Sequence, residues 1–360
     1  MKRNYGIDLL RMVLMFMVVI LHILGHGGVL GATSQLTVKY GAAWLLETFA
    51  YCAVNCFALF SGYVNYSSRY KFSSLLQIWL QALVYSVGIA ACMWIWKPED
   101  FSVGGLVSVC LPVLKGGYWY LTAYVGLFVL IPFLNAGINA LSEEKAKAYL
   151  WLLFCAFSVL PTLARKDVFL TNSGYSAFWL AYLYLIGGCL KKFQWGESWR
   201  TWQAALVYIG CVLLSWGIKM GTEGITACLS DGPKSYVNFI SYISPTMVMA
   251  TVSLFFTFQK CRVPQKLIRL ISEFSPAAFG VYLIHEHKMI RSQFVAKKFG
   301  FLAEFSAPGM IIGVIGSAAA IFLSCLLIDW IRHKIFIRAH VKEHLERLEK
   351  KWGHFHSLVQ

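Results

Sequence analysis

Long apolar stretches recur along the whole chain, and short polar segments with most of the charges separate them. Stretches of this length and composition predict helices that cross a bilayer. They lie at 7–25, 42–64, 74–96, 117–137, 148–163, 175–190, 201–219, 236–258, 276–291 and 309–331. The pattern therefore predicts an all-α, polytopic integral membrane protein with about ten transmembrane helices.

Two segments depart from this pattern. The segment 98–117 is moderately apolar but contains glycines and Pro112, so a re-entrant segment and an outer-surface loop are both compatible with it. The chain after Ile331 is hydrophilic, with apolar residues at helical spacing among Lys and Arg, which predicts a basic amphipathic helix. We accordingly divide the chain into a transmembrane unit, 1–331, and a basic amphipathic cytoplasmic tail, 332–360.

Composition and charge agree with a multi-pass protein of the cell membrane. The chain is 58% hydrophobic and only 14% charged, well below the charged fraction of a soluble domain. Most Lys and Arg fall on alternate loops, so the positive-inside rule predicts that both termini are cytoplasmic. The same bias explains the net charge of +15, so the lipid bilayer, not a nucleic acid, is the expected partner. The cysteines show neither zinc spacing nor a disulfide framework, and we predict no metal.

The first apolar stretch contains three ionisable residues, which are costly inside a membrane and usually mark function. Asp8 and Arg11 lie near its start and His22 in its far half. Asp8 and Arg11 are three residues apart and can pair locally, which would give Arg11 a structural role at the cytoplasmic interface. Arg11 and His22 share one helix face but lie roughly 16 Å apart along the axis. They can therefore serve the two ends of one elongated site.

Two further groups are candidates for the ends of such a site. At the end shared with His22, an outward pocket is expected from Glu47, Trp119, Tyr120, Tyr282 and His285. An aromatic belt at the membrane interface explains Trp119 and Tyr120 equally well. At the cytoplasmic end, Arg11, Arg69 and Lys71 are candidates for binding an anionic donor, although positive-inside charge also explains the last two. Gly62 is expected to allow close approach of two helices.

These residues resemble the motifs of a known family. The resemblance lies in Asp8-Leu9-Leu10-Arg11 with His22 after ten apolar residues, Phe60-Ser61-Gly62-Tyr63, Gly117-Tyr118-Trp119-Tyr120-Leu121, and Phe279-Gly280-Val281-Tyr282-Leu283-Ile284-His285. The four motifs occur in the same order as in the acyltransferase-3 family of integral-membrane acyltransferases, and they span nearly the whole chain. The chain is therefore similar to a stand-alone member without a fused extracytoplasmic domain.

The resemblance implies an enzyme that moves an acyl group, usually acetyl, from cytoplasmic acyl-CoA to a hydroxyl. The acceptor would be a cell-envelope glycan or another envelope molecule, and acyl-CoA would be a substrate, with no bound cofactor. The essential Arg and His of the family correspond to Arg11 and His22. Some members carry Arg-x-x-Arg after the second helix, whereas this chain has Arg69-Tyr70-Lys71, a departure that weakens the prediction of donor binding there.

A mechanism follows from these residue types. His22 can act as a general base on the acceptor hydroxyl, or form a covalent acyl-histidine. His285, Tyr120 and Tyr282 are candidates to orient His22 or to stabilise the oxyanion. The alternative function is a transporter or flippase of a small molecule or lipid-linked sugar, because ionisable groups within helices also serve transport.

Overall fold

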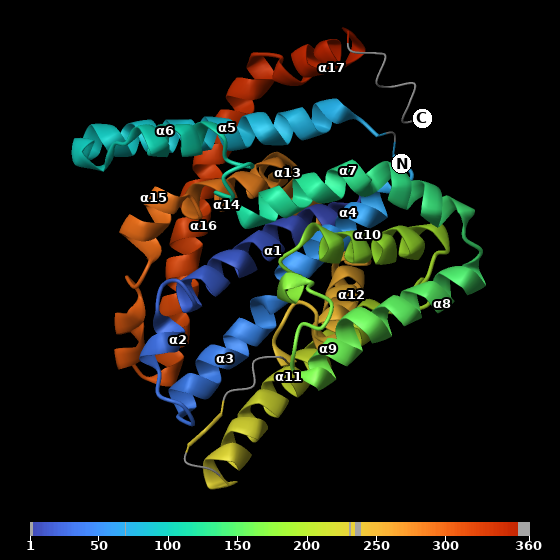
Figure 1. Cartoon of the computed structure of the whole chain (residues 1–360), viewed down its shortest axis with the longest axis vertical. Coiled ribbons are helices and arrows are strands. Elements are labelled where there is room, and N and C mark those ends of the chain that lie inside the picture. The colour runs from blue at the N-terminus through green and yellow to red at the C-terminus, as the bar shows by residue number, and fades with distance from the viewer. Residues whose placement is uncertain (1–2, 69, 230–231, 235–238, 352–360) are drawn as a thin grey trace.

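A computed structural model describes residues 3–68, 70–229, 232–234 and 239–351 of the chain. The described part contains helices and no strands (Figure 1). The helices of the first half are α1 (Tyr5–Leu24), α2 (Val29–Ala32), α3 (Val38–Tyr51), α4 (Ala53–Asn65), α5 (Phe72–Trp96), α6 (Val103–Cys110), α7 (Trp119–Ala140), α8 (Glu143–Phe154) and α9 (Leu160–Ala164). Those of the second half are α10 (Ala177–Lys192), α11 (Thr201–Leu229), α12 (Pro245–Gln259), α13 (Gln265–Phe274), α14 (Ala278–His285), α15 (Lys288–Ile290), α16 (Ala307–Arg338) and α17 (Val341–Lys351).

Every predicted apolar stretch contains helix within its described residues. Within the described residues, eight helical segments are long and apolar enough to cross a membrane. The predicted spans 175–190 and 236–258 correspond to two helices that are not among these eight, α10 with 16 residues and α12 with 15. The prediction of an all-α, multi-pass membrane protein is therefore confirmed. The count of ten crossings and the cytoplasmic location of both termini stay predictions.

Helix α1 occupies the centre of the bundle. It contacts α3, α4, α12, α14 and α16, and most of its residues are buried (Figure 1). The Asn4 side chain caps its start by accepting hydrogen bonds from the N–H groups of Gly6 and Ile7. Because α1 is surrounded by other helices, the polar side chains on it face protein and not lipid.

Helices α4 and α10 cross at very short range and form the most extensive helix pair of the bundle (Figure 1). A Cβ at Gly62 would collide with the carbonyl oxygen of Tyr184, and one at Gly187 would collide with that of Leu59. The predicted role of Gly62 in close helix approach is confirmed, and Gly187 supplies the matching gap on the other helix.

The two segments outside the regular pattern are also helical. Residues 103–110 form α6, which packs beside α5. Helix α16 continues through residue 331 to Arg338, and α17 lies across the start of α5 (Figure 1). There Lys71 Nζ lies 3.0 Å from Glu346 Oε1, so the tail is bound to the bundle by at least one ion pair. The division of the chain at residue 331 stays a prediction.

Candidate active site

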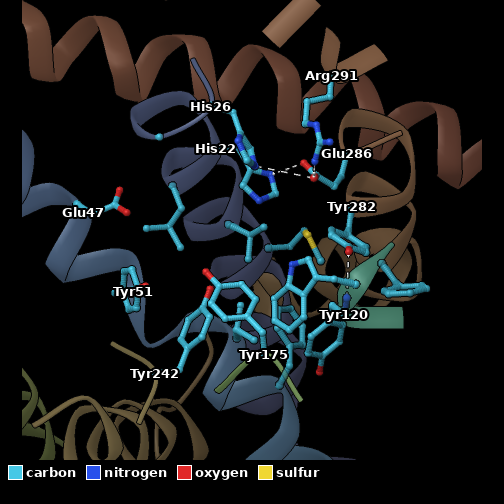
Figure 2. A pocket seen from close by; sticks show the side chains of 18 residues that line it. His22, His26, Glu47, Tyr51, Tyr120, Tyr175, Tyr242, Tyr282, Glu286 and Arg291 are labelled. Atoms are coloured by element: carbon cyan, nitrogen blue, oxygen red, sulfur yellow. Dashed lines mark hydrogen bonds and ion pairs between the residues drawn. The ribbon is translucent and has the colours of Figure 1, made fainter. Parts of the chain in front are cut away.

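A cavity of about 300 Å³ opens at the end of the bundle where α1 and α14 end and where α7 begins (Figure 2). Its polar and aromatic walls come from six parts of the chain that lie far apart in sequence. The residues that line it are Met15, Val18, Leu21, His22, Gly25, His26, Glu47, Tyr51, Val54, Phe57, Trp119, Tyr120, Tyr175, Tyr242, Phe279, Tyr282, Glu286 and Arg291. Five of the predicted site residues, His22, Glu47, Trp119, Tyr120 and Tyr282, are thus brought together.

A chain of hydrogen bonds runs from the cavity into the core through two imidazoles. His285 Nδ1 lies 2.6 Å from the carbonyl oxygen of Val281, one helical turn earlier. A carbonyl only accepts, so His285 Nδ1 carries the proton and its Nε2 is an acceptor. His22 Nδ1 lies 2.8 Å from that Nε2 and must donate to it. The remaining nitrogen of His22, Nε2, is therefore unprotonated and basic.

Exposure separates the roles of the two histidines. The side chain of His22 is 16% exposed and lines the cavity, whereas His285 is only 2% exposed and lies behind it. The relay thus has a direction: the backbone sets the tautomer of His285, and His285 sets that of His22. In proteins, the hydrogen bond made by one ring nitrogen of a histidine commonly decides whether the other nitrogen carries a proton.

A buried carboxylate lies beside this relay. Glu286, directly after the end of α14, is 4% exposed, and its Oε2 lies 3.2 Å from His22 Nδ1 (Figure 2). The contact lacks hydrogen-bond geometry, so its effect on His22 is electrostatic. Arg291 binds the other oxygen of Glu286 as an ion pair. Burial raises the pKa of Glu286 to about 7, although Arg291 opposes the rise.

Aromatic rings form the opposite wall in a continuous series. Tyr175 lies between Trp119 and Tyr242, with ring centroids 4.5 Å and 4.9 Å away. Tyr242 in turn lies 4.8 Å from Tyr51 (Figure 2). Tyr175 is 40% exposed, so the series runs from the buried cavity to the surface. Trp119 is therefore part of a pocket wall.

Glu47 completes the lining on the α3 side. It is 8% exposed, and its Oε2 has no hydrogen-bond partner among the described residues. Tyr282 and Tyr120 are joined to each other, because the backbone N–H of Tyr120 donates to Tyr282 Oη at 3.4 Å. The two tyrosines thus hold the start of α7 against α14.

The contacts of Asp8 and Arg11, near the start of α1, differ from the prediction. Asp8 does not pair with Arg11: its Oδ2 lies 2.6 Å from Nε of Arg3, which reaches it from the segment before the helix. Helical spacing allowed the Arg11 pair, but Arg3 offers a competing guanidinium outside the helix. Arg11 instead lies over the ring of Phe60, 5.5 Å from its centroid, and no carboxylate is within ion-pair distance of it among the described residues.

The predicted donor cluster is only partly visible. Arg11 does not line the cavity, in keeping with its place about three turns from His22. Lys71 is engaged with Glu346 of α17, and Arg69 lies outside the described residues. The prediction that these three residues bind the donor together stays a prediction.

Three side chains that can bind a metal ion also lie close together in this site. Ligand atoms of His22, His285 and Glu286 lie within 4.8 Å of one another. Two nitrogens on a tetrahedral zinc ion would be roughly 3.3 Å apart. The 2.8 Å contact between His22 and His285 is instead that of a hydrogen bond. The arrangement found thus fits a proton relay better than a metal site.

Several lining residues were not among the sequence candidates. Glu286 directly follows the predicted His285, but a carboxylate at a helix end normally meets water, and nothing local indicates its burial. Arg291, Tyr51, Tyr175 and Tyr242 carry no motif signal either. Only the adjacency of His285 and Glu286 offered a clue, since a buried acid next to an imidazole tunes its basicity.

Comparison with known proteins identifies the family to which the chain belongs. No curated protein and no solved structure matches the chain. The family model described as "Acyltransferase domain", that of the acyltransferase-3 family, matches residues 4–329, which include α1 to α15 and most of α16. The matched region contains the whole cavity and both ends of α1. The chain belongs to the acyltransferase-3 family and is a multi-pass membrane acyltransferase.

Proposed function

We propose that the protein transfers an acyl group, most simply acetyl, from acyl-CoA to a hydroxyl of a cell-envelope glycan or other envelope acceptor. The observation that carries this proposal is the relay from the Val281 carbonyl through His285 to His22. It leaves a basic imidazole nitrogen on the one histidine of the pair that lines the cavity.

The proposed reaction is a direct transfer. His22 Nε2 removes the proton of the acceptor hydroxyl while its oxygen attacks the thioester carbonyl carbon. The carbon–oxygen bond forms, the carbon–sulfur bond breaks, and the thiolate of CoA leaves with the proton that His22 had taken. During this cycle the imidazole is transiently cationic, and the Glu286 carboxylate 3.2 Å from Nδ1 stabilises that charge. A two-step transfer through a covalent acyl-histidine would use the same residues.

The donor would approach from the Arg11 end of α1. Arg11 has no carboxylate partner among the described residues, so its charge is available for phosphate oxygens of CoA. The rise of about 1.5 Å per residue over eleven residues gives roughly 16 Å between Arg11 and His22. An extended pantetheine arm is of the same order of length, so its thioester can reach the cavity while the phosphates stay near Arg11.

The acceptor would enter along the aromatic wall. Tyr175 at the surface and Trp119, Tyr242 and Tyr51 behind it offer ring faces on which the apolar face of a sugar can pack. In this arrangement the two substrates meet at His22 from opposite ends of α1, so neither has to cross the path of the other.

The test is acyl transfer by the purified protein in detergent. Radiolabelled acetyl-CoA and the envelope glycan fraction of the producing cell are mixed, and label is followed into the glycan. Transfer to glycan in the absence of any closed compartment is the expected result. A protein that moves no label in detergent but moves a solute across sealed vesicles would contradict the proposal and support a transporter.

A further inference from the structure

A second cavity of about 470 Å³ adjoins the one at His22. The two share Glu47 and Tyr51, which lie on the opposite side of the first cavity from Glu286 and Arg291 in the view of Figure 2. The rest of its lining comes from Trp44 of α3, Pro161 and Thr162 of α9, and the segments 165–173 and 240–243. The two cavities therefore meet at a boundary formed by one turn of α3.

Buried polar atoms without partners concentrate in this second cavity. Trp44 Nε1, Glu47 Oε2 and Thr162 Oγ1 all lack a hydrogen-bond partner among the described residues. Glu47 is 8% exposed and Thr162 is 5% exposed, so their polar atoms are held inside the protein. An unsatisfied buried polar group costs about 1–3 kcal/mol. The three residues that carry these atoms all line the second cavity, so a polar ligand bound there could satisfy them.

The chemistry of these atoms specifies that ligand. An indole N–H only donates, the unpartnered Oε2 of Glu47 can accept, and a hydroxyl does both. A hydroxyl of a sugar can accept from Trp44 and donate to Glu47 at once, whereas a lipid chain satisfies none of them. The ring of Trp44 is itself fixed, because Lys219 Nζ lies 3.9 Å from its centroid. The donor atom thus has a defined position before any ligand binds.

The rim of the cavity is also held in a fixed shape. The loop 165–174 contains four non-glycine residues with positive φ, namely Arg165, Leu170, Asn172 and Ser173. Asp167 compensates this strain by accepting from Thr171 N–H at 2.9 Å, from the Thr171 hydroxyl at 2.8 Å and from Ser173 N–H at 3.0 Å. Strained backbone maintained in this way is concentrated at binding sites.

We propose that this second cavity, here called the acceptor chamber, binds a sugar unit adjoining the one that is acylated, through Trp44, Glu47 and Thr162. The proposal rests on the proposed function, and it narrows the acceptor to a glycan of at least two units. One unit lies on the aromatic wall with its hydroxyl at His22, and the next passes Glu47 into the acceptor chamber.

The experiment compares acceptors of different length with the full-length protein in detergent. Acetyl transfer from labelled acetyl-CoA is measured for β-1,4-linked N-acetylglucosamine of one to four units and for envelope glycans hydrolysed to the same lengths. The wild type is expected to show a lower KM for two or more units than for one. Thr162→Val, which keeps the shape of the side chain, and Trp44→Phe, which removes the indole N–H together with part of the ring, should raise the KM for the longer acceptors about 3- to 10-fold. Glu47→Gln should raise it about 10- to 100-fold.

A matched control variant lies outside the chamber. Trp94 Nε1 is likewise buried and has no hydrogen-bond partner in the described part of the chain, but Trp94 lines neither cavity, so Trp94→Phe should leave both KM values unchanged. Equal KM for one and several units in the wild type would overturn the acceptor chamber, as would chamber variants that match wild type for the longer acceptors. Failure of the wild type to acetylate any acceptor would instead contradict the proposed function itself.

Discussion

The charge of Glu286 offers the sharpest test of the relay. Glu286→Gln keeps the size of the side chain and removes its charge 3.2 Å from His22 Nδ1. Two unit charges at this distance interact by about 5 kcal/mol at an effective dielectric constant of about 20. The nearby Arg291 offsets part of this energy. We therefore expect kcat to fall about 100- to 1000-fold, which corresponds to about 2.7–4 kcal/mol of transition-state stabilisation.

The pH dependence supplies a second readout of the same change. Burial raises the pKa of Glu286 to about 7, with Arg291 opposing, so the carboxylate is ionised above that pH and protonated below it. Wild-type kcat/KM should accordingly decrease as the pH falls through about 7. The amide of Glu286→Gln does not titrate, so this limb should be absent from its profile.

The assay is acetyl transfer from labelled acetyl-CoA between pH 5 and 9, with thermal unfolding as a check on each variant. Glu304→Gln serves as control, since Glu304 is exposed and lines neither cavity. A Glu286→Gln enzyme that keeps kcat within threefold of wild type, or an unchanged acid limb, would refute the role given to this carboxylate.

Three further predictions concern other parts of the molecule. Arg11→Lys should raise the KM for acetyl-CoA about tenfold with little change in kcat, because an ammonium cannot bind phosphate in the planar, bidentate manner of a guanidinium; an unchanged KM in a donor titration would argue against donor binding at this end. Gly62→Ala should lower stability by about 1–3 kcal/mol, because its Cβ would collide with the Tyr184 carbonyl; an unaltered thermal midpoint in detergent would contradict that packing. Incubation with 1,10-phenanthroline should leave the transfer rate unchanged, because the nitrogens of His22 and His285 bind each other; loss of activity that zinc restores would favour a metal site.

Much of the fold could be predicted from hydrophobic patterning, because a bilayer requires long apolar helices. The break between α3 and α4 at Cys52 could not, since the sequence around it is uniformly apolar. The start of α12 at Pro245 was equally hidden, because the buried apolar residues Ile240, Tyr242 and Ile243 directly precede it.

The site was predictable only in part, for a related reason. Depth along the helices placed His22, His285, Glu47, Trp119 and Tyr120 at one end of the bundle, and the structure brings them together there. Which acid contacts which base depends instead on how segments outside the helices fold. Asp8 thus binds Arg3 and not Arg11, and the burial of Glu286 follows from the turn after α14. Helical spacing contains no information on either contact.

The central claim is that His22 carries the acyl transfer. The most direct measurement compares wild type with His22→Gln, both purified in detergent and shown by thermal unfolding to be folded, for transfer of label from acetyl-CoA to envelope glycan. The account predicts transfer by the wild type and a loss of at least 100-fold in the variant, since general-base help is worth about 10²–10⁴-fold. A folded His22→Gln enzyme with the full rate of transfer would contradict it.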